Sequence, residues 1–89
     1  MPKPESHPHW PEDGDHAFVA SFLLILRDAR LEQGLSIREV AQKAGIDHGI
    51  IARGERMDRI PSIVTMRRWV RALELDWHQV YKDAESAGL

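Results

Sequence analysis

The fold of this chain is constrained most by the residues around Gly45, where one short helix must end and another must begin at once. Ser36 and Glu39 have the spacing of a capping box, in which each side chain binds the backbone N–H of the other residue. Gly45 can adopt the left-handed conformation that commonly ends a helix, and Asp47 is a favourable N-cap for the next one. The segment therefore predicts two short helices set at a fixed angle, over residues 37–44 and 48–54.

Apolar residues at helical spacing predict three further helices. The first is expected over residues 16–33 and ends at Gly34. Leu23 and Leu24 make its apolar face wide, so we expect this helix to meet a second surface, either a dimer mate or Trp10. The residues expected to face inward from this helix are Phe18, Phe22, Ile25, Leu26 and Ala29.

The other two helices are expected over residues 62–73 and 77–85. Asp76 and Gln79 have the spacing of a capping box at the start of the last helix. The chain has neither the alternating pattern of a strand nor an internal repeat. We therefore predict an all-α fold of five short helices. The residues expected to face inward from the helix over 62–73 are Ile63, Met66, Trp69, Val70 and Leu73.

A chain of 89 residues has the length of one small domain. Residues 1–15 hold four of the five prolines and are predicted to form a flexible arm, followed by a domain over residues 16–86 and a tail over residues 87–89. The most apolar window, residues 18–26, is too short to span a membrane, and the N-terminus does not read as a signal peptide. Together with the lack of cysteine, this predicts a soluble, cytoplasmic protein.

Charge is distributed unevenly along the chain, although the net charge is only −2. Residues 21–73 hold ten Lys/Arg and six Asp/Glu residues, whereas the two flanks together hold two and eight. A basic centre between acidic ends fits a nucleic-acid-binding surface, and it fits the plain solvation of surface helices equally well.

The residue types around Gly45 match a helix-turn-helix. Ala41 is small enough to let the two helices approach closely, and Ile46 and Ile51 fill the angle between them. Over roughly residues 26–77 the chain resembles the Cro/C1-type (XRE) helix-turn-helix family. The matching frame reads LRxxRxxxGLS from Leu26, EVAxKAGI from Glu39, IxRxE from Ile51, RxPS from Arg59 and ALxLD from Ala72.

This resemblance implies a lambda-repressor-like fold and a transcriptional regulator, in function a repressor, that binds double-stranded DNA as a homodimer. It implies no enzymatic activity, no metal, no cofactor and no small-molecule substrate. Arg30 and Glu55 occupy the positions of a buried structural ion pair. The positions implied to face base edges are His48, Gly49, Ile50 and Arg53. The positions implied to hold phosphates are Ile37, through its backbone N–H, and the side chains of Arg38, Lys43, Arg56 and Arg59.

Arg53 is the strongest candidate for reading a base, because a guanidinium can donate two parallel hydrogen bonds to guanine O6 and N7. His48 can donate or accept, and Ile50 can contact a thymine methyl group. The alternatives are that Arg53 is a solvated surface arginine and that His48 is a helix-start residue without a partner. Gly54 replaces a large apolar residue of the family and Met57 replaces a loop glycine, so we expect the third helix to be short or tilted.

Other functions have weaker support in the sequence. His7, His9 and His16 could bind a metal ion, but the intervening prolines break any regular spacing, and we expect an arm without a metal site. No nucleophile lies beside a base in any known catalytic pattern. A protein-interaction module, or an antitoxin-like protein with reduced DNA binding, stays open as an alternative. In that case the residues expected to face the partner, or else to be solvated, are Arg67, Arg68 and Arg71.

Overall fold

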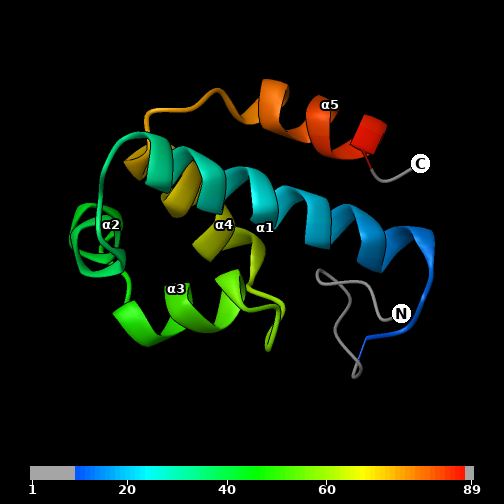
Figure 1. Ribbon diagram of the computed structural model, residues 1–89, viewed down its shortest axis with the longest axis horizontal. Helices are drawn as coiled ribbons and strands as arrows, with labels where there is room; N and C mark the ends of the chain where they lie inside the picture. Colours follow the sequence, from blue (N-terminus) through cyan, green and yellow to red (C-terminus); the bar gives the residue numbers. More distant parts are fainter. Residues whose placement is uncertain (1–9, 88–89) are drawn as a thin grey trace.

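The computed structural model describes residues 10–87, and all regular structure in this part of the chain is α-helical (Figure 1). The five predicted helices are all present: α1 (Gly14–Glu32), α2 (Ile37–Ala44), α3 (His48–Glu55), α4 (Ile63–Ala72) and α5 (Trp77–Ala87). Residues 1–9 and 88–89 lie outside the described part, and with them most of the predicted arm, two of its histidines and the end of the predicted tail. None of the helices in residues 10–87 is long and apolar enough to cross a membrane.

Capping side chains set where α1, α2 and α3 begin. The predicted capping box of α2 is present, since Glu39 N–H donates to Ser36 Oγ (3.0 Å) and Ser36 N–H donates to Glu39 Oε1 (2.7 Å). Asp47 caps α3 by accepting from the backbone N–H of Gly49 at 2.9 Å. Helix α1 begins two residues earlier than expected because Asp13 caps it, accepting from the N–H of His16 at 2.8 Å.

Four helices end with a residue in the left-handed conformation. Gly34 and Gly45 follow α1 and α2 with φ of +70° and +68°, as the sequence predicted. Helices α3 and α4 end in the same way at two residues that are not glycine, Met57 (φ 60°) and Glu74 (φ 58°). After α3, the N–H groups of Met57 and Asp58 donate to the carbonyls of Gly54 and Arg53, which is the hydrogen-bond pattern of a Schellman motif.

Helix α1 lies along α5 on one side and contacts α3 as well, while α2 packs on α3 and α4 (Figure 1). Phe22 and Leu23 on α1 are fully buried. The ring of Phe22 lies 5.2 Å from that of Trp77, and Trp10 packs on the edge of the same core. The second surface expected for α1 is therefore α5 of the same chain, joined by Trp10, and the width of its apolar face does not by itself require a dimer mate.

Two local predictions were wrong. Ile63 was expected to face inward, but 58% of its surface is exposed, because it is the first residue of α4 and lies one turn before Met66, where the helix enters the core. Gln79 was expected to complete a capping box with Asp76. Instead Asp76 Oδ1 accepts from the backbone N–H of His78 at 2.9 Å, and Gln79 Nε2 donates to Asp83 Oδ1, one turn further along the helix, at 2.9 Å.

Candidate nucleic-acid interface

Helices α2 and α3 are the two short helices that the sequence predicted on either side of Gly45. Ala41 on α2 and Ile51 on α3 are buried, and Ile46 packs partly buried against the core between the two helices. The turn is tied by a backbone hydrogen bond of 3.0 Å from Ile46 N–H to the Ala41 carbonyl. The direction of α3 is thus fixed by packing at its start.

An ion pair between Arg30 and Glu55 fixes the far end of α3. Arg30 Nε and Nη2 donate to Glu55 Oε2 and Oε1 at 2.7 and 2.8 Å, and Arg30 Nη1 donates to the carbonyl of Leu35 at 2.9 Å. The side chains of Arg30 and Glu55 are only 13% and 6% exposed. The hydrogen bonds to Glu55 raise the pKa of Arg30 above its ordinary value despite its burial. The pair expected from the sequence is therefore present as a bidentate link between the ends of α1 and α3.

One face of α3 is left open to solvent. Ile51, Gly54 and Glu55 are buried against the rest of the protein. Gly49 and Arg53 lie one turn apart on the opposite face, and the exposed His48 begins the helix. Of the four residues expected to face bases, His48 and Arg53 are exposed, whereas Gly49 and Ile50 are half-buried.

Helix α3 is short, as expected, and runs one residue beyond the predicted end to Glu55. Gly54 lies inside the helix, at the position where the ring of Trp69 approaches the helix backbone. A Cβ atom at residue 54 would lie 3.0 Å from Trp69 Cζ3. Met57 is buried and adopts the left-handed conformation that a glycine would favour, so the turn after α3 forms without a glycine.

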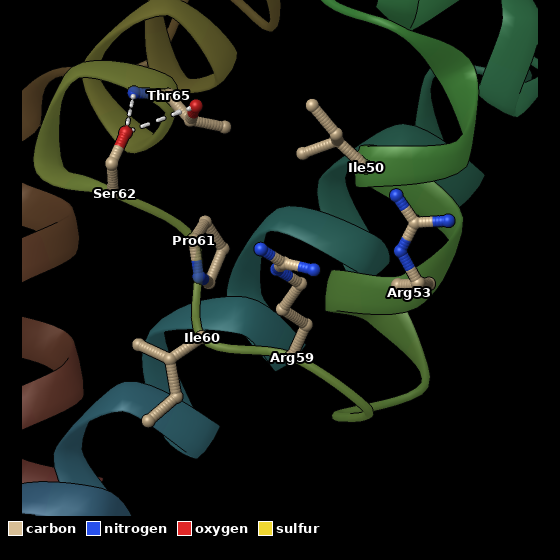
Figure 2. A pocket seen from close by; sticks show the side chains of 7 residues that line it. All are labelled: Ile50, Arg53, Arg59, Ile60, Pro61, Ser62 and Thr65. Atoms are coloured by element: carbon tan, nitrogen blue, oxygen red, sulfur yellow. Dashed lines mark hydrogen bonds between the residues drawn. The ribbon is translucent and has the colours of Figure 1, made fainter.

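A groove of about 430 Å³ lies between α3, the loop that follows it and the start of α4 (Figure 2). Arg53 from α3 and Arg59 from the loop both bring guanidinium groups to it. Both arginines are exposed. Ile50, also expected at the interface from the sequence, lines the groove as well. Sequence reasoning did not place the remaining lining residues there, because their position depends on the path of the loop. These residues are Ile60, Pro61, Ser62 and Thr65.

The residues expected to hold phosphates differ in their exposure and in their hydrogen bonds. Arg38 and Lys43 are exposed on α2. The side chain of Ile37 packs against the core, which leaves only its backbone N–H for an anion. Arg56 is exposed, but its Nε donates to Asp58 Oδ2 at 2.8 Å, so a phosphate at Arg56 would compete with a carboxylate of the same chain.

A sequence model of the helix-turn-helix family matches residues 26–79, which is more than half of the chain. The chain therefore belongs to the helix-turn-helix family of the Cro/C1 (XRE) type, and its five-helix arrangement is the lambda-repressor-like fold. Membership indicates DNA binding and transcriptional regulation, in a family that is typically non-enzymatic. Comparisons with curated proteins and with solved structures found no significant match.

Proposed function

We propose that this protein is a transcriptional regulator that binds specific sequences in double-stranded DNA by inserting α3 into the major groove. The observation that carries the proposal is the open face of α3, which presents Gly49 and Arg53 while packing and the Arg30–Glu55 pair hold the helix rigidly. A major groove admits one α-helix, and the N-terminal residues of the second motif helix then meet base edges. Arg53 donates to a guanine, and His48 and Ile50 contact neighbouring bases.

Contacts to the sugar–phosphate backbone come from the cations on either side of α3. Arg59 lies across the groove from Arg53, and Arg38 and Lys43 extend from α2. Arg56 joins them by exchanging Asp58 for a phosphate. Such contacts fix the register of the protein on the duplex and supply affinity that depends on salt, without reading sequence.

The protein binds as a homodimer and represses by occupying its site in the cytoplasm. A single α3 offers few groups that read bases, so a second copy is needed to give a site of useful specificity. Two copies related by a two-fold axis would contact half-sites about one helical turn apart. Light scattering at high protein concentration tests the homodimer. A monomer mass for the free protein, together with a complex that holds one protein per operator duplex, would rule the homodimer out.

A protein partner is the second candidate, and the exposed face of α4 is the observation that favours it. Ile63 and Val64 are 58% and 57% exposed at the start of this helix. Exposed arginines follow them on the same helix, at positions 67, 68 and 71. Exposed aliphatic side chains next to cations suit an acidic protein surface, and such binding would have a different salt response from binding to DNA.

Titration of a labelled duplex at several salt concentrations distinguishes the two candidates. DNA binding through about five phosphate contacts loses affinity steeply between roughly 50 and 200 mM salt. Arg59→Ala should reduce the slope of log K against log salt by about one, whereas Arg71→Ala on α4 should leave it unchanged. Failure to bind any duplex even at the lowest salt would rule out the proposed function and favour the protein partner.

A further inference from the structure

Arg53 does not extend away from α3 but runs back along it, over the position of Gly49. A Cβ atom built on Gly49 would lie 3.2 Å from Arg53 Nη1 and 3.7 Å from Arg53 Cζ. Figure 2 shows the Arg53 side chain running along α3 toward the turn that carries Ile50. The guanidinium therefore occupies the space that a side chain at residue 49 would fill.

The carboxylate of Asp47 closes the other side of this space. The same Cβ atom at residue 49 would lie 2.8 Å from Asp47 Oδ2, which is the oxygen that caps α3 through the N–H of Gly49. Since Asp47 Oδ2 and Arg53 Nη1 lie 2.8 and 3.2 Å from one point, the two atoms are at most 6.0 Å apart. Opposite charges at such a separation attract, which favours the position of the guanidinium above the first turn.

We propose that Gly49 determines sequence specificity by its lack of a side chain. It keeps the first turn of α3 free for the guanidinium of Arg53, so that Arg53 reads a guanine at the base pair that faces Gly49 and not one turn further along the helix. This inference rests on the proposed DNA binding. Gly49 has a positioning role that acts through Arg53. Residues 49 and 53 therefore recognise one base pair together.

A double-mutant cycle on the preferred duplex tests this joint recognition. The variants are Gly49→Ala, Arg53→Ala and both together, and Gly14→Ala is the matched control, because a Cβ atom at Gly14 would meet no atom within 4 Å. Arg53→Ala alone should weaken binding roughly 5- to 150-fold and relax the preference at one base pair. On the Gly49→Ala background the same change should weaken binding less than on the wild type, because the new Cβ atom, 3.2 Å from Arg53 Nη1, shifts the guanidinium from its place over the first turn.

A readout without DNA tests the placement of Arg53 independently. Arg53→Ala should move the backbone amide resonance of Gly49 in the NMR spectrum of the free protein, whereas Arg71→Ala should not. An unmoved Gly49 resonance overturns the inference. The inference is also overturned if the losses in binding free energy for Gly49→Ala and Arg53→Ala are additive. If the wild-type protein still binds its duplex selectively in that case, the proposed function survives. If the wild-type protein binds no duplex, the proposed function fails and this inference fails with it.

Discussion

The ring of Trp69 lies against the backbone of Gly54, so that a Cβ atom at residue 54 would lie 3.0 Å from Cζ3 and 3.1 Å from Cη2. Trp69 is fully buried at the centre of the core. The large indole of α4 thus fills the space that a side chain on α3 would otherwise occupy. The lack of a side chain at residue 54 therefore allows α3 and α4 to approach each other closely at this point.

A larger residue at position 54 should therefore destabilise the protein. Gly54→Val forces the indole or α3 to move, and we expect the free energy of unfolding to fall by about 1–3 kcal/mol. Denaturant unfolding measures the loss. Trp69→Leu should be less harmful on the Gly54→Val background than on the wild type, because it frees the volume that valine needs. Equal costs on the two backgrounds would show that residues 54 and 69 do not compete for space.

Removal of one member of the Arg30–Glu55 pair should be more costly. Arg30→Ala leaves the Glu55 carboxylate, 6% exposed, without its bidentate partner, and we expect a loss of about 3–5 kcal/mol in the free energy of unfolding. Arg71→Ala, at an exposed position, should change stability by no more than about 0.5 kcal/mol. Replacing both residues of the pair with methionine should cost less than Arg30→Ala alone. Similar losses for Arg30→Ala and Arg71→Ala would contradict the structural role of the pair.

Glu74 and Met57 share one backbone conformation but differ in burial, so glycine should have opposite effects at the two positions. Glu74 is exposed with φ 58°, and Glu74→Gly should stabilise the protein by about 0.5–1 kcal/mol by relieving left-handed strain at a helix end. Met57 has φ 60° but is 4% exposed, so Met57→Gly loses more from burial than it gains from the backbone. Thermal unfolding of both variants checks this, and destabilisation by Glu74→Gly would contradict it.

Acid should weaken the capping box of α2. The backbone N–H of Ser36, and then its hydroxyl, lower the pKa of Glu39 below its ordinary value of 4.5. A carboxylate with a lowered pKa in the folded state contributes stability that is complete above the unfolded pKa and is lost as pH falls through the folded pKa. Between about pH 5 and pH 3, the melting temperature of Glu39→Gln should therefore fall less steeply than that of the wild type.

Asp13 also loses a stabilising contact in acid, because the N–H and then the ring of His16 lower its pKa. Because Asp13 is present in both the wild type and Glu39→Gln, the difference between their pH profiles of melting temperature reports the contribution of Glu39 alone. Parallel profiles for the wild type and Glu39→Gln would show that the box has no part in acid sensitivity.

Substitution of Arg53 should affect sequence specificity, whereas substitution of Arg56 should affect overall affinity for DNA. Arg53→Ala should relax the preference for one base pair by about 1–3 kcal/mol, whereas Arg56→Ala should weaken binding to all duplexes to a similar extent. Competition between the preferred duplex and single-base-pair variants measures the difference. Equal losses on every sequence for Arg53→Ala would remove its role in reading a base.

The sequence was sufficient to predict the five helices, because the signals involved are local. The capping box of Ser36 and Glu39, the cap at Asp47 and the left-handed turn at Gly45 each depend on neighbours within a few residues. The prediction for Ile63 failed because helical spacing says nothing about where along its length a helix enters the core. The turns at Met57 and Glu74 could not be predicted, since neither residue type favours a positive φ.

The candidate site was predictable only in part. The resemblance to the family predicted which residues of α3 face DNA and that Arg30 pairs with Glu55, because the spacing of these positions is preserved in the sequence. The groove beside Arg59 and the return of Arg53 over Gly49 depend on side-chain placement in three dimensions. No single-sequence pattern encodes such contacts, so they became visible only in the structure.

Selection from a random pool of duplexes at about 100 mM salt, read by sequencing, tests the central claim most directly. If α3 reads DNA as proposed, the pool becomes enriched in an inverted repeat whose half-sites lie about one helical turn apart and contain a guanine that Arg53→Ala no longer selects. A pool without enrichment, and without retained DNA at lower salt, would contradict the account and show that the helix-turn-helix around Gly45 does not serve DNA in this protein.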